Sequence, residues 1–597
     1  MKVLLFISLI ILIKGQEEYE ENEEEYNEYK EYEKLISEKV SEEYCNDVIS
    51  NLTSILDDVY IYLDFIKAPK QPAGYDSYIP KADLIKELND INKKDRYFYD
   101  FYRDIKKVFE KTRDGHLYFS AFTTPNYFSL EDYYFCIPFK YTIKEIFNKE
   151  NKVNDTFLTI ESVNSCKNGY SNETIEKIEK LEGKKINKIN DISPYEYLEE
   201  MGKKFYVVHS PQARYIIKIS QIHNLYIDIY PFKKEELNIS IEFEENELLQ
   251  LEYQFKKLKF YNKEFKKYFL EEKKKLYKGF FPILDFEQLG VKYKIKKGII
   301  SKKIKKDINW DMVSEDETIK CKVDEKNKYN VIHQISFYPE NFYDYEEIME
   351  QCFSEFYSND YNIIIIEDRN GGGYTGLCVP FTQYLRPKIS KPDYSAIKNG
   401  EINLEYYTNY YQVLNPETCL PFTDKDKLLE GIEDKYSEEV IHKKSKIFDN
   451  LDVYDKKNMD KIRKEYLSTG KIKKPTEIII FTDGYSFSCT SSLITGLQVH
   501  GSAIIVGYNS RPDLNKNNFD ASQSNSGVSE YKNSEFINNL NNLGCYLSIT
   551  MEELFDPNDK DNPKTPFEFL VNPVDEIVQS IKNMMMKYMI DLLMKQI

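Results

Sequence analysis

The chain has 597 residues and a formal net charge of −18, from 82 Lys and Arg against 100 Asp and Glu. This length exceeds what one hydrophobic core serves, so we expect several domains. A nucleic-acid-binding protein needs a basic face to neutralise phosphates, and the acidic balance argues against that class. The nine cysteines include no Cys-x-x-Cys pair and no cluster with His at metal-ligand spacing, which predicts neither a metal site nor a cofactor.

The first 43 residues are predicted to be an export signal and an acidic tail. An apolar run over 3–13 is too short to span a bilayer, so residues 1–15 are typical of a signal peptide cleaved near Gly15. Residues 16–43 are rich in Glu and Tyr, and thirteen Glu with three Lys give −10 over 17–43. This predicts disorder or a solvated tail. No other stretch is apolar enough to cross a membrane, so we expect a secreted, extracellular protein.

Four Asn-x-Ser/Thr acceptors follow the predicted signal peptide, which fits N-glycosylation of an exported eukaryotic protein. They are Asn51, Asn154, Asn172 and Asn238. In an oxidising compartment several of the nine cysteines are expected to pair, but their spacing does not define the connectivity. The odd number leaves at least one thiol free or bonded to another chain.

Residues 44–134 are predicted to form a helical N-terminal domain. Apolar residues recur at i, i+4 spacing over 48–59, and further helical patterns follow. Asp114-Gly115 then predicts a turn, and His116 opens a strand-like run. A lone histidine is usually structural or simply exposed, so its position alone does not make His116 a base.

Two further regions precede the C-terminal part. Residues 135–250 are strand-rich, and 175–201 resembles a PDZ-like module, in which a strand, a tight turn at Gly183, a second strand and a helix bind peptides by strand addition. Residues 251–320 are rich in lysine with interleaved aromatic residues. Because glutamates lie nearby, this composition favours a solvated linker or insertion over an anion-binding surface.

Residues 321–597 are predicted to be an α/β domain, and the first informative stretch in it is 362–374, NIIIIEDRNGGGY. Its apolar run is typical of a strand buried on both faces. Three consecutive glycines follow, and they let backbone N–H groups point jointly at an oxyanion. The stretch lacks the Lys-Ser/Thr of a phosphate-binding P-loop, and a plain strand-to-helix turn stays open.

The second informative stretch is 477–507, EIIIFTDGYSFSCTSSLITGLQVHGSAIIVG, which predicts a strand, a turn, a helix and a strand. Ser486 and Ser488 lie where the turn becomes a helix. The first N–H groups of a helix have no internal partner, so a serine there can attack a carbonyl while these groups receive the oxyanion. A serine at this place can also simply cap the helix, and this stretch alone leaves both interpretations open.

Taken together, these stretches resemble the C-terminal processing, or tail-specific, serine peptidases. In that family one strand ends in text similar to DRNGGG, here 368–373, and a second ends in D-G-x-x-x-S before a helix, here 483–488. An upstream D-G-H, here 114–116, is similar to the branch of the chlamydial protease-like activity factor and its secreted fungal relatives, in which histidine replaces lysine as the base. The resemblance covers about residues 45–597 and is strong only in these three stretches.

The resemblance implies an α/β multidomain fold whose catalytic domain is built from ClpP/crotonase-like βαβ units. It implies Ser488 as the nucleophile, His116 as the base and Glu568 as the residue that orients the imidazole. It also implies an oxyanion hole. The N–H groups that would form this hole are those of Cys489 and of Gly372 or Gly373.

Two features near the C-terminus complete this prediction. The lysine branch of the family carries its base in a G-K-G-like segment, whereas the equivalent region here has Lys516 in an Asn-rich loop. A Ser–Lys dyad is therefore disfavoured and a Ser–His site preferred. Residues 576–597 form a Met-rich amphipathic pattern, which predicts a helix that packs on the catalytic domain or on a second subunit and so leaves a homodimer open.

The sequence therefore favours a secreted serine endopeptidase that hydrolyses protein or peptide substrates through an acyl-enzyme. The alternative is a catalytically inactive secreted peptide- or ligand-binding protein on the same fold. The bulky Phe487 beside the serine, in place of the family's usual small residue, supports that alternative. A nucleotide-dependent enzyme on the glycine run is disfavoured because the matching lysine and acidic residues are missing.

Overall fold

The computed structural model describes residues 36–72, 78–123, 128–129, 133–147, 153–163, 166–205, 208–221, 224–226, 232–257, 310–387, 394–403, 446–449, 464, 468, 472–511, 516–525, 527–529, 535–555 and 566–578. The predicted signal peptide, most of the acidic tail, most of the lysine-rich region and residues 579–597 lie outside the described residues. The helix predicted over 576–597 is wrong at its start, because residues 576–578 form a strand. No helix in these ranges is long and apolar enough to span a membrane.

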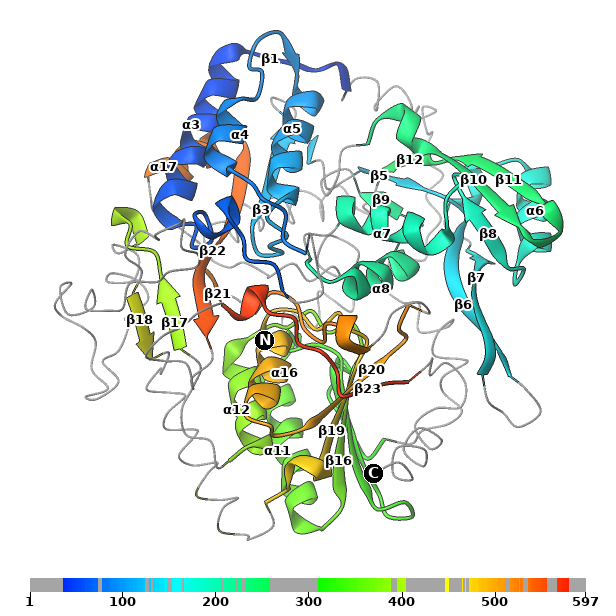
Figure 1. The fold of residues 1–597 in the computed structure, drawn as a ribbon, viewed down its shortest axis with the longest axis vertical. Helices are drawn as coiled ribbons and strands as arrows, with labels where there is room; N and C mark the ends of the chain where they lie inside the picture. The colour runs from blue at the N-terminus through cyan, green and yellow to red at the C-terminus, as the bar shows by residue number, and fades with distance from the viewer. Residues whose placement is uncertain are drawn as a thin grey trace, which may run out of the picture.

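A seven-stranded sheet forms the centre of the C-terminal half (Figure 1). Its order is β13-β14-β15-β16-β19-β20-β23, and the strands from β15 to β23 run parallel. The bounds are β13 Met312–Val313, β14 Ile319–Asp324, β15 Tyr329–Gln334, β16 Asn362–Glu367, β19 Ile478–Thr482, β20 Ile504–Tyr508 and β23 Glu576–Val578. The two predicted buried strands are β16 and β19. They pair directly, so the loops that follow them leave the same edge of the sheet.

Three helices cover one face of this sheet (Figure 1). They are α11 Phe342–Ser358, α12 Thr375–Leu385 and α16 Cys489–Val499. Phe353, Phe381 and Leu493 from these helices form one core with Ile365 of the sheet. The other face carries a smaller core that includes Ile479. Burial on both faces explains why these strands are continuous apolar runs.

A second sheet joins the N-terminal region to the C-terminal half. Its order is β18-β17-β22-β3-β4, and β21 also pairs with β22. The bounds are β18 Lys446–Asp449, β17 Tyr394–Ile397, β22 Cys545–Phe555, β3 Tyr118–Thr123, β4 Phe128–Ser129 and β21 Gly527–Ser529. Residues 118–121 of β3 pair with 545–548 of β22 in antiparallel register. The strand that follows His116 is therefore bonded to one from near the end of the chain.

Helices of the predicted N-terminal domain pack around this sheet, as Figure 1 shows. They are α3 Glu42–Val59, α4 Leu84–Asn89 and α5 Phe98–Glu110, and α17 Glu535–Asn542 lies against α3. The apolar spacing over 48–59 is confirmed as the buried face of α3, which carries Val48, Leu52 and Leu56. Ser41 begins this helix, because its side chain accepts a hydrogen bond from the N–H of Tyr44 at 3.0 Å.

Between these parts lies a region of helices and three small sheets, with orders β11-β10-β8, β12-β5-β9 and β6-β7. The strands are β5 Tyr133–Cys136, β6 Phe139–Phe147, β7 Val153–Ser162, β8 Ile186–Ile189, β9 Asn224–Tyr226, β10 Asn238–Phe243, β11 Leu248–Glu252 and β12 Gln254–Lys257. The helices are α6 Asn172–Leu181, α7 Pro194–Phe205 and α8 Pro211–Gln221. The described residues thus form a mixed helix and sheet fold.

One predicted element of the PDZ-like stretch is wrong. The segment before Gly183, expected to be a strand, is helix α6. Ser171 caps that helix by accepting a hydrogen bond from the N–H of Thr174, and Ile178 and Leu181 are buried at i, i+3 spacing. The turn at Gly183, the strand β8 and the helix α7 are confirmed. The PDZ-like character of the region stays a prediction.

Short elements and disulfides complete the described fold. The short elements are β1 Lys39–Val40, β2 Arg96–Tyr97 and the 3-10 helices η1 Phe65–Lys67, η3 Lys167–Gly169, η4 Lys234–Leu237, η5 Glu244–Asn246, η6 Pro475–Glu477, η7 Lys516–Asn518 and η9 Phe567–Phe569. Disulfides join Cys136 to Cys166 and Cys321 to Cys352. The described cysteines outside these pairs are buried free thiols, namely Cys45, Cys378, Cys489 and Cys545.

Candidate active site

Ser488 lies at the junction of the loop after β19 and helix α16. Its backbone has φ 54° and ψ −121°, a conformation that a residue with a side chain adopts only under constraint from its surroundings. Two contacts hold it: its N–H donates to the Gln523 carbonyl at 3.1 Å, and its carbonyl accepts from the N–H of Ser492 at 3.0 Å. The Ser488 side chain makes no capping hydrogen bond to the helix. The interpretation of Ser488 as a simple helix cap is therefore wrong.

Ser486, the other serine of this loop, has a structural environment. Its hydroxyl forms a hydrogen bond with the hydroxyl of Thr482 at 2.9 Å, and its carbonyl accepts from the N–H of Gln523 at 2.6 Å. Both groups are thus used to fasten the loop. Of the two serines, Ser488 is the one whose strained backbone presents a hydroxyl that is not used for capping.

The glycine loop after β16 lies directly against Ser488. The N–H of Phe487 donates to the Asn370 carbonyl at 3.0 Å. A Cβ atom placed on Gly372 would lie 2.6 Å from the Phe487 carbonyl oxygen and 2.9 Å from both the Cys489 nitrogen and the Ser488 Cβ. Gly372 also has φ 88°. Only glycine fits this position, and the close approach brings the loop backbone to the first N–H group of α16.

The same loop distinguishes between the two predicted glycine donors. The N–H of Gly372 already donates to Asn370 Oδ1 at 3.0 Å, and its carbonyl accepts from the N–H of Phe337 at 2.8 Å. Gly373 has φ 141°, and a Cβ there would lie 2.2 Å from the carbonyl carbon of Phe337. The N–H of Gly372 is therefore already engaged within the loop itself.

Two buried carboxyl groups brace these loops: Glu367 holds the glycine loop through Asn370, and Asp483 ties the glycine loop to the serine loop. Burial raises the pKa of Glu367 to about 8, although its hydrogen bond from Asn370 Nδ2 at 2.6 Å opposes the shift. Burial and the neighbouring Asp368 charge raise the pKa of Asp483 to about 7. Asp483 accepts from the N–H groups of Arg369 at 3.2 Å and Tyr485 at 2.9 Å. These groups fix the relative position of the two loops.

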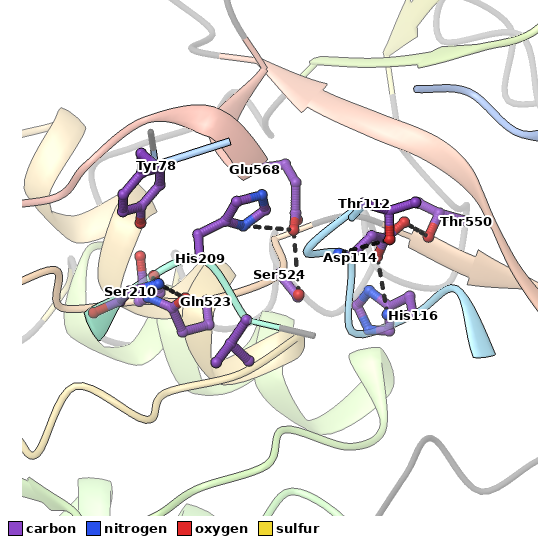
Figure 2. A network of polar contacts seen from close by, with 12 residues as sticks. Tyr78, Thr112, Asp114, His116, His209, Ser210, Gln523, Ser524, Thr550 and Glu568 are labelled. Atoms are coloured by element: carbon purple, nitrogen blue, oxygen red, sulfur yellow. Dashed lines mark hydrogen bonds and ion pairs between the residues drawn. The ribbon is translucent and has the colours of Figure 1, made fainter. Parts of the chain in front are cut away.

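His116 lies in a buried turn that Asp114 holds together (Figure 2). The Asp114 carboxylate accepts from the N–H of His116 at 2.9 Å and from Thr550 Oγ1, on β22, at 2.5 Å. Burial raises the pKa of Asp114 to about 6. The predicted Asp-Gly turn is thus confirmed, and its aspartate anchors the histidine to a strand from near the end of the chain.

The His116 ring packs beside the residue that precedes Ser488. Its centroid lies 4.8 Å from that of the Phe487 ring, and a Cβ placed on Gly115 would lie 2.5 Å from Phe487 Cε2. Burial lowers the pKa of His116 to about 3, so its imidazole is neutral at neutral pH. Among the described residues, no hydrogen bond joins the Ser488 hydroxyl to the His116 ring. The two predicted residues therefore lie in the same region but are not hydrogen-bonded.

Glu568 lies in η9 and is buried. Its Oε1 accepts a hydrogen bond from Ser524 Oγ at 3.2 Å and lies 3.6 Å from Nδ1 of His209. In Figure 2 the carboxylate lies between His209 and the turn that carries His116. The structure thus adds His209 and Ser524 to the residues that sequence reasoning had selected.

No local signal in the sequence marks His209 or Ser524. His209 precedes the helix α8, an ordinary context for a structural histidine, and Ser524 lies in the segment 519–525, which the sequence predicts only as part of an Asn-rich loop. That segment is buried throughout. It was missed because its partners come from distant parts of the chain.

Lys516 lies apart from these contacts. It is exposed on η7, and its ammonium group donates to the Asp575 carbonyl at 3.1 Å. This contact joins Lys516 to the backbone beside β23. In the described ranges, no group of three or more His, Cys, Asp and Glu side chains is placed to hold a metal ion.

Among known proteins, similarity to this chain is found in solved structures. Neither a family model nor a curated protein sequence matches this chain. It is similar to mature CPAF, at 11% identity over 89% of this chain and 93% of that chain with a TM-score of 0.47, and to CPAF complexed with lactacystin, at 11% identity over 89% and 94% with a TM-score of 0.46. It is also similar to the photosystem II D1 C-terminal processing protease, at 9% identity over 90% and 94% with a TM-score of 0.31.

Proposed function

We propose that the chain is a serine peptidase that uses Ser488 as its nucleophile. The observation that carries the proposal is the constrained backbone of Ser488, which presents a non-capping hydroxyl at the start of α16 beside the glycine loop. A nucleophile on a strained strand-to-helix turn, with backbone N–H groups next to it, is an arrangement that acyl-transfer enzymes use. The named proteases among similar structures agree with this reaction class.

In the proposed reaction His116 accepts the proton of Ser488 Oγ, and the alkoxide attacks the carbonyl carbon of a peptide bond. Glu568 keeps the imidazole in the required orientation and tautomer. His116 then donates the proton to the leaving amine, and a water molecule activated by the same imidazole hydrolyses the acyl-enzyme. His116 is neutral at neutral pH, the state in which an imidazole can accept a proton. Because burial also weakens its basicity, the reaction requires a carboxylate such as Glu568 to stabilise the imidazolium that forms.

The proposed oxyanion hole consists of the N–H groups of Cys489 and Gly373. Removing one such donor typically costs about 2.7–4 kcal/mol of transition-state stabilisation. The reaction also requires His116 and Ser488 to come within about 2.6–3.2 Å of each other, and catalytic hydrogen bonds commonly tighten only when substrate binds. We therefore propose that this hydrogen bond forms in the substrate complex.

The test is Ser488→Ala in the exported protein. We expect the variant to lose hydrolysis of an unfolded protein substrate and covalent labelling by a fluorophosphonate probe, while Tm stays close to that of the wild type. Ser486→Ala is the matched control, because it removes a hydroxyl from the same loop and leaves Ser488 in place. Labelling that persists in Ser488→Ala and disappears in Ser486→Ala would contradict the assignment.

A second candidate is a catalytically inactive peptide- or ligand-binding protein. The specific observation in its favour is the His116 ring, which packs on Phe487 without a hydrogen bond to the Ser488 hydroxyl. A wild-type protein that neither hydrolyses unfolded substrate nor reacts with the probe would support this candidate over the peptidase.

The setting of the proposed activity is extracellular. Two disulfides, Cys136–Cys166 and Cys321–Cys352, support export into an oxidising compartment. Among the proposed glycosylation sites, Asn172 and Asn238 are exposed. Mass measurement of the exported protein before and after deglycosylation tests these sites together with Asn51 and Asn154. We further propose that its substrates are proteins or peptides.

A further inference from the structure

The Glu568 carboxylate is fully enclosed, with no exposed side-chain surface. A buried carboxylate is costly unless hydrogen-bond donors surround it. Ser524 Oγ donates to it at 3.2 Å, and Nδ1 of His209 lies 3.6 Å away. We propose that Ser524 and His209 are positioning residues that hold this carboxylate beside the turn of His116. This inference rests on the proposed function, since Glu568 needs positioning only if His116 acts as the base.

Ser524 connects the carboxylate with both other members of the proposed site. A Cβ placed on Gly115 would lie 3.3 Å from Ser524 Oγ, so the hydroxyl fills the space between Glu568 and the histidine turn. The preceding residue, Gln523, accepts the N–H of Ser488 through its carbonyl. Ser524 also has φ 51°, a constrained conformation for a residue with a side chain. One short segment therefore fixes the nucleophile and the carboxylate relative to each other.

The His209 ring is held in a single orientation. Its centroid lies 5.4 Å from the stacked ring of Tyr78 and 5.4 Å from the ring of Phe569, which meets it edge-on. Among the described residues, the second ring nitrogen, Nε2, has no hydrogen-bond partner. A neutral imidazole carries one N–H group, so the tautomer with its proton on Nδ1 directs that group toward Glu568.

The charge state of His209 agrees with this role. Burial lowers the pKa of His209 well below its ordinary value, and the positive charges of Arg214 and Arg113 lower it further. The imidazole therefore stays neutral at neutral pH. Its Nδ1 faces Glu568 Oε1 at 3.6 Å, a polar contact slightly longer than a hydrogen bond, and the neutral ring adds no positive charge beside His116.

A ring of polar contacts holds these groups in place (Figure 2). The Tyr78 hydroxyl donates to the Asp520 carboxylate, which also accepts from Gln523 Nε2 at 3.1 Å. Gln523 Oε1 accepts the N–H of Ser210, the neighbour of His209, at 3.0 Å. The segment that carries Ser524 is thus linked by hydrogen bonds to Ser210, which follows His209 in the chain, and through Asp520 to Tyr78, which stacks on the His209 ring. A rigid holder of this kind is what a catalytic carboxylate requires.

The experiment compares Ser524→Ala and His209→Asn with the wild-type full chain on one fluorogenic peptide and one unfolded protein substrate. We expect kcat to fall roughly 10- to 100-fold in Ser524→Ala, the effect of losing a hydrogen bond to a charged group, while KM stays unchanged. His209→Asn, which removes a longer polar contact, should lower kcat by roughly 10-fold or less. Ser522→Ala is the matched control. It removes a buried hydroxyl two residues away that bonds Thr495 at 3.0 Å and Asn572 at 2.9 Å, so we expect it to retain wild-type kcat.

A double-mutant cycle separates positioning from a merely structural role. If Ser524 acts through Glu568, adding Ser524→Ala to Glu568→Gln lowers kcat no further. Additive losses, or single variants with wild-type kcat, overturn the inference and leave the proposed function standing. A wild-type protein inert to substrate and probe overturns the proposed function itself. Thermal unfolding verifies the fold of each variant, and Ser524→Ala decides alone if His209→Asn does not fold.

Discussion

The proposed site has two sides that are assembled in different ways. The serine side, made of Ser488, Cys489 and the glycine loop 370–373, follows two strands that are neighbours in one parallel sheet, β16 and β19. The histidine side, made of His116, His209, Ser524 and Glu568, comes from four segments spread over the chain. The serine side is therefore a product of one domain. The histidine side exists only because the N-terminal region packs on the C-terminal half through the β3–β22 pairing.

Because the two sides are assembled differently, a substitution can impair the serine side and leave the histidine side intact, or the reverse. Outside the proposed catalytic residues, Gly372→Ala is expected to have the largest effect, because it places a Cβ 2.6 Å from the Phe487 carbonyl at a position with φ 88°. Displacement of the loop from Cys489 should lower kcat by roughly 10²–10³-fold, the loss typical of one oxyanion donor. The loss is measured from the rate of hydrolysis of an unfolded protein and from the rate of labelling by the fluorophosphonate probe.

Gly371→Ala is the matched control for that prediction. A Cβ on Gly371 meets no atom within 4 Å, although it is the adjacent residue of the same loop. We expect wild-type hydrolysis and labelling. Equal damage from both substitutions would show that the loop is sensitive to any side chain, and the argument for a specific contact at Gly372 would fail.

The anchor of the histidine turn is expected to give the next largest effect. Thr550→Val keeps the shape of the side chain but removes the hydroxyl that donates to Asp114. Loss of a hydrogen bond to a buried carboxyl group should lower the free energy of unfolding by about 1–3 kcal/mol, measured by urea denaturation. It should also slow probe labelling of Ser488, because the His116 turn is less firmly held.

Thr159→Val provides the comparison. Its hydroxyl is buried on β7 and, within the described residues, makes no hydrogen bond. Replacing it with a methyl group should leave the free energy of unfolding unchanged or raise it. If Thr550→Val were equally harmless, Asp114 could not be the link between β22 and the histidine turn.

The sequence predicted the serine side better than the histidine side, and the different assembly of the two sides explains why. The loops at 370–373 and 483–488 were predicted because continuous apolar runs mark buried strands and glycines mark the constrained turns after them. Those signals are local. The structure confirmed both strands and Ser488 at the helix start, and it adds the close approach of Gly372 to Cys489.

The histidine side left weaker signals. Asp114-Gly115 predicted the turn of His116, but nothing near His209 or Ser524 indicates that both contact Glu568, because a hydrogen bond between distant segments leaves no periodic pattern. The error in the PDZ-like stretch has another origin. There Ser171 caps a helix over a short apolar run that had been read as a strand.

Buried acids on the serine side predict a pH effect on stability. The pKa of Glu367 in the folded chain is about 8, above its value in an unfolded chain, so the folded state holds this proton more tightly. The resulting stabilisation is present below the unfolded value and is lost as pH rises through about 8. We expect the free energy of unfolding to fall between pH 5 and 8, by at most about 1.4 kcal/mol per pH unit for this one group.

Glu367→Gln should make that dependence shallower, with a larger gain relative to the wild type at pH 8 than at pH 5. Some slope should persist, since Asp483, with a pKa of about 7, acts in the same direction. Glu350→Gln changes the net charge equally on the exposed face of α11 and should keep the wild-type slope. Urea denaturation at each pH measures all three proteins, and an unaltered slope in Glu367→Gln would refute the assignment.

The smallest effect is expected from Lys516→Ala, and comparing it with His116→Ala shows which residue is the catalytic base. Lys516 is exposed on η7 and bonds only a backbone carbonyl among its described contacts, so Lys516→Ala should leave both Tm and kcat at wild-type values. His116→Ala should abolish hydrolysis. The opposite result would place the base at Lys516, after β20, as in the lysine branch of the peptidases, and the proposed activity would then need only the C-terminal half. Packing of the N-terminal region would in that case serve stability, and the network around Glu568 would lose its proposed part in the reaction.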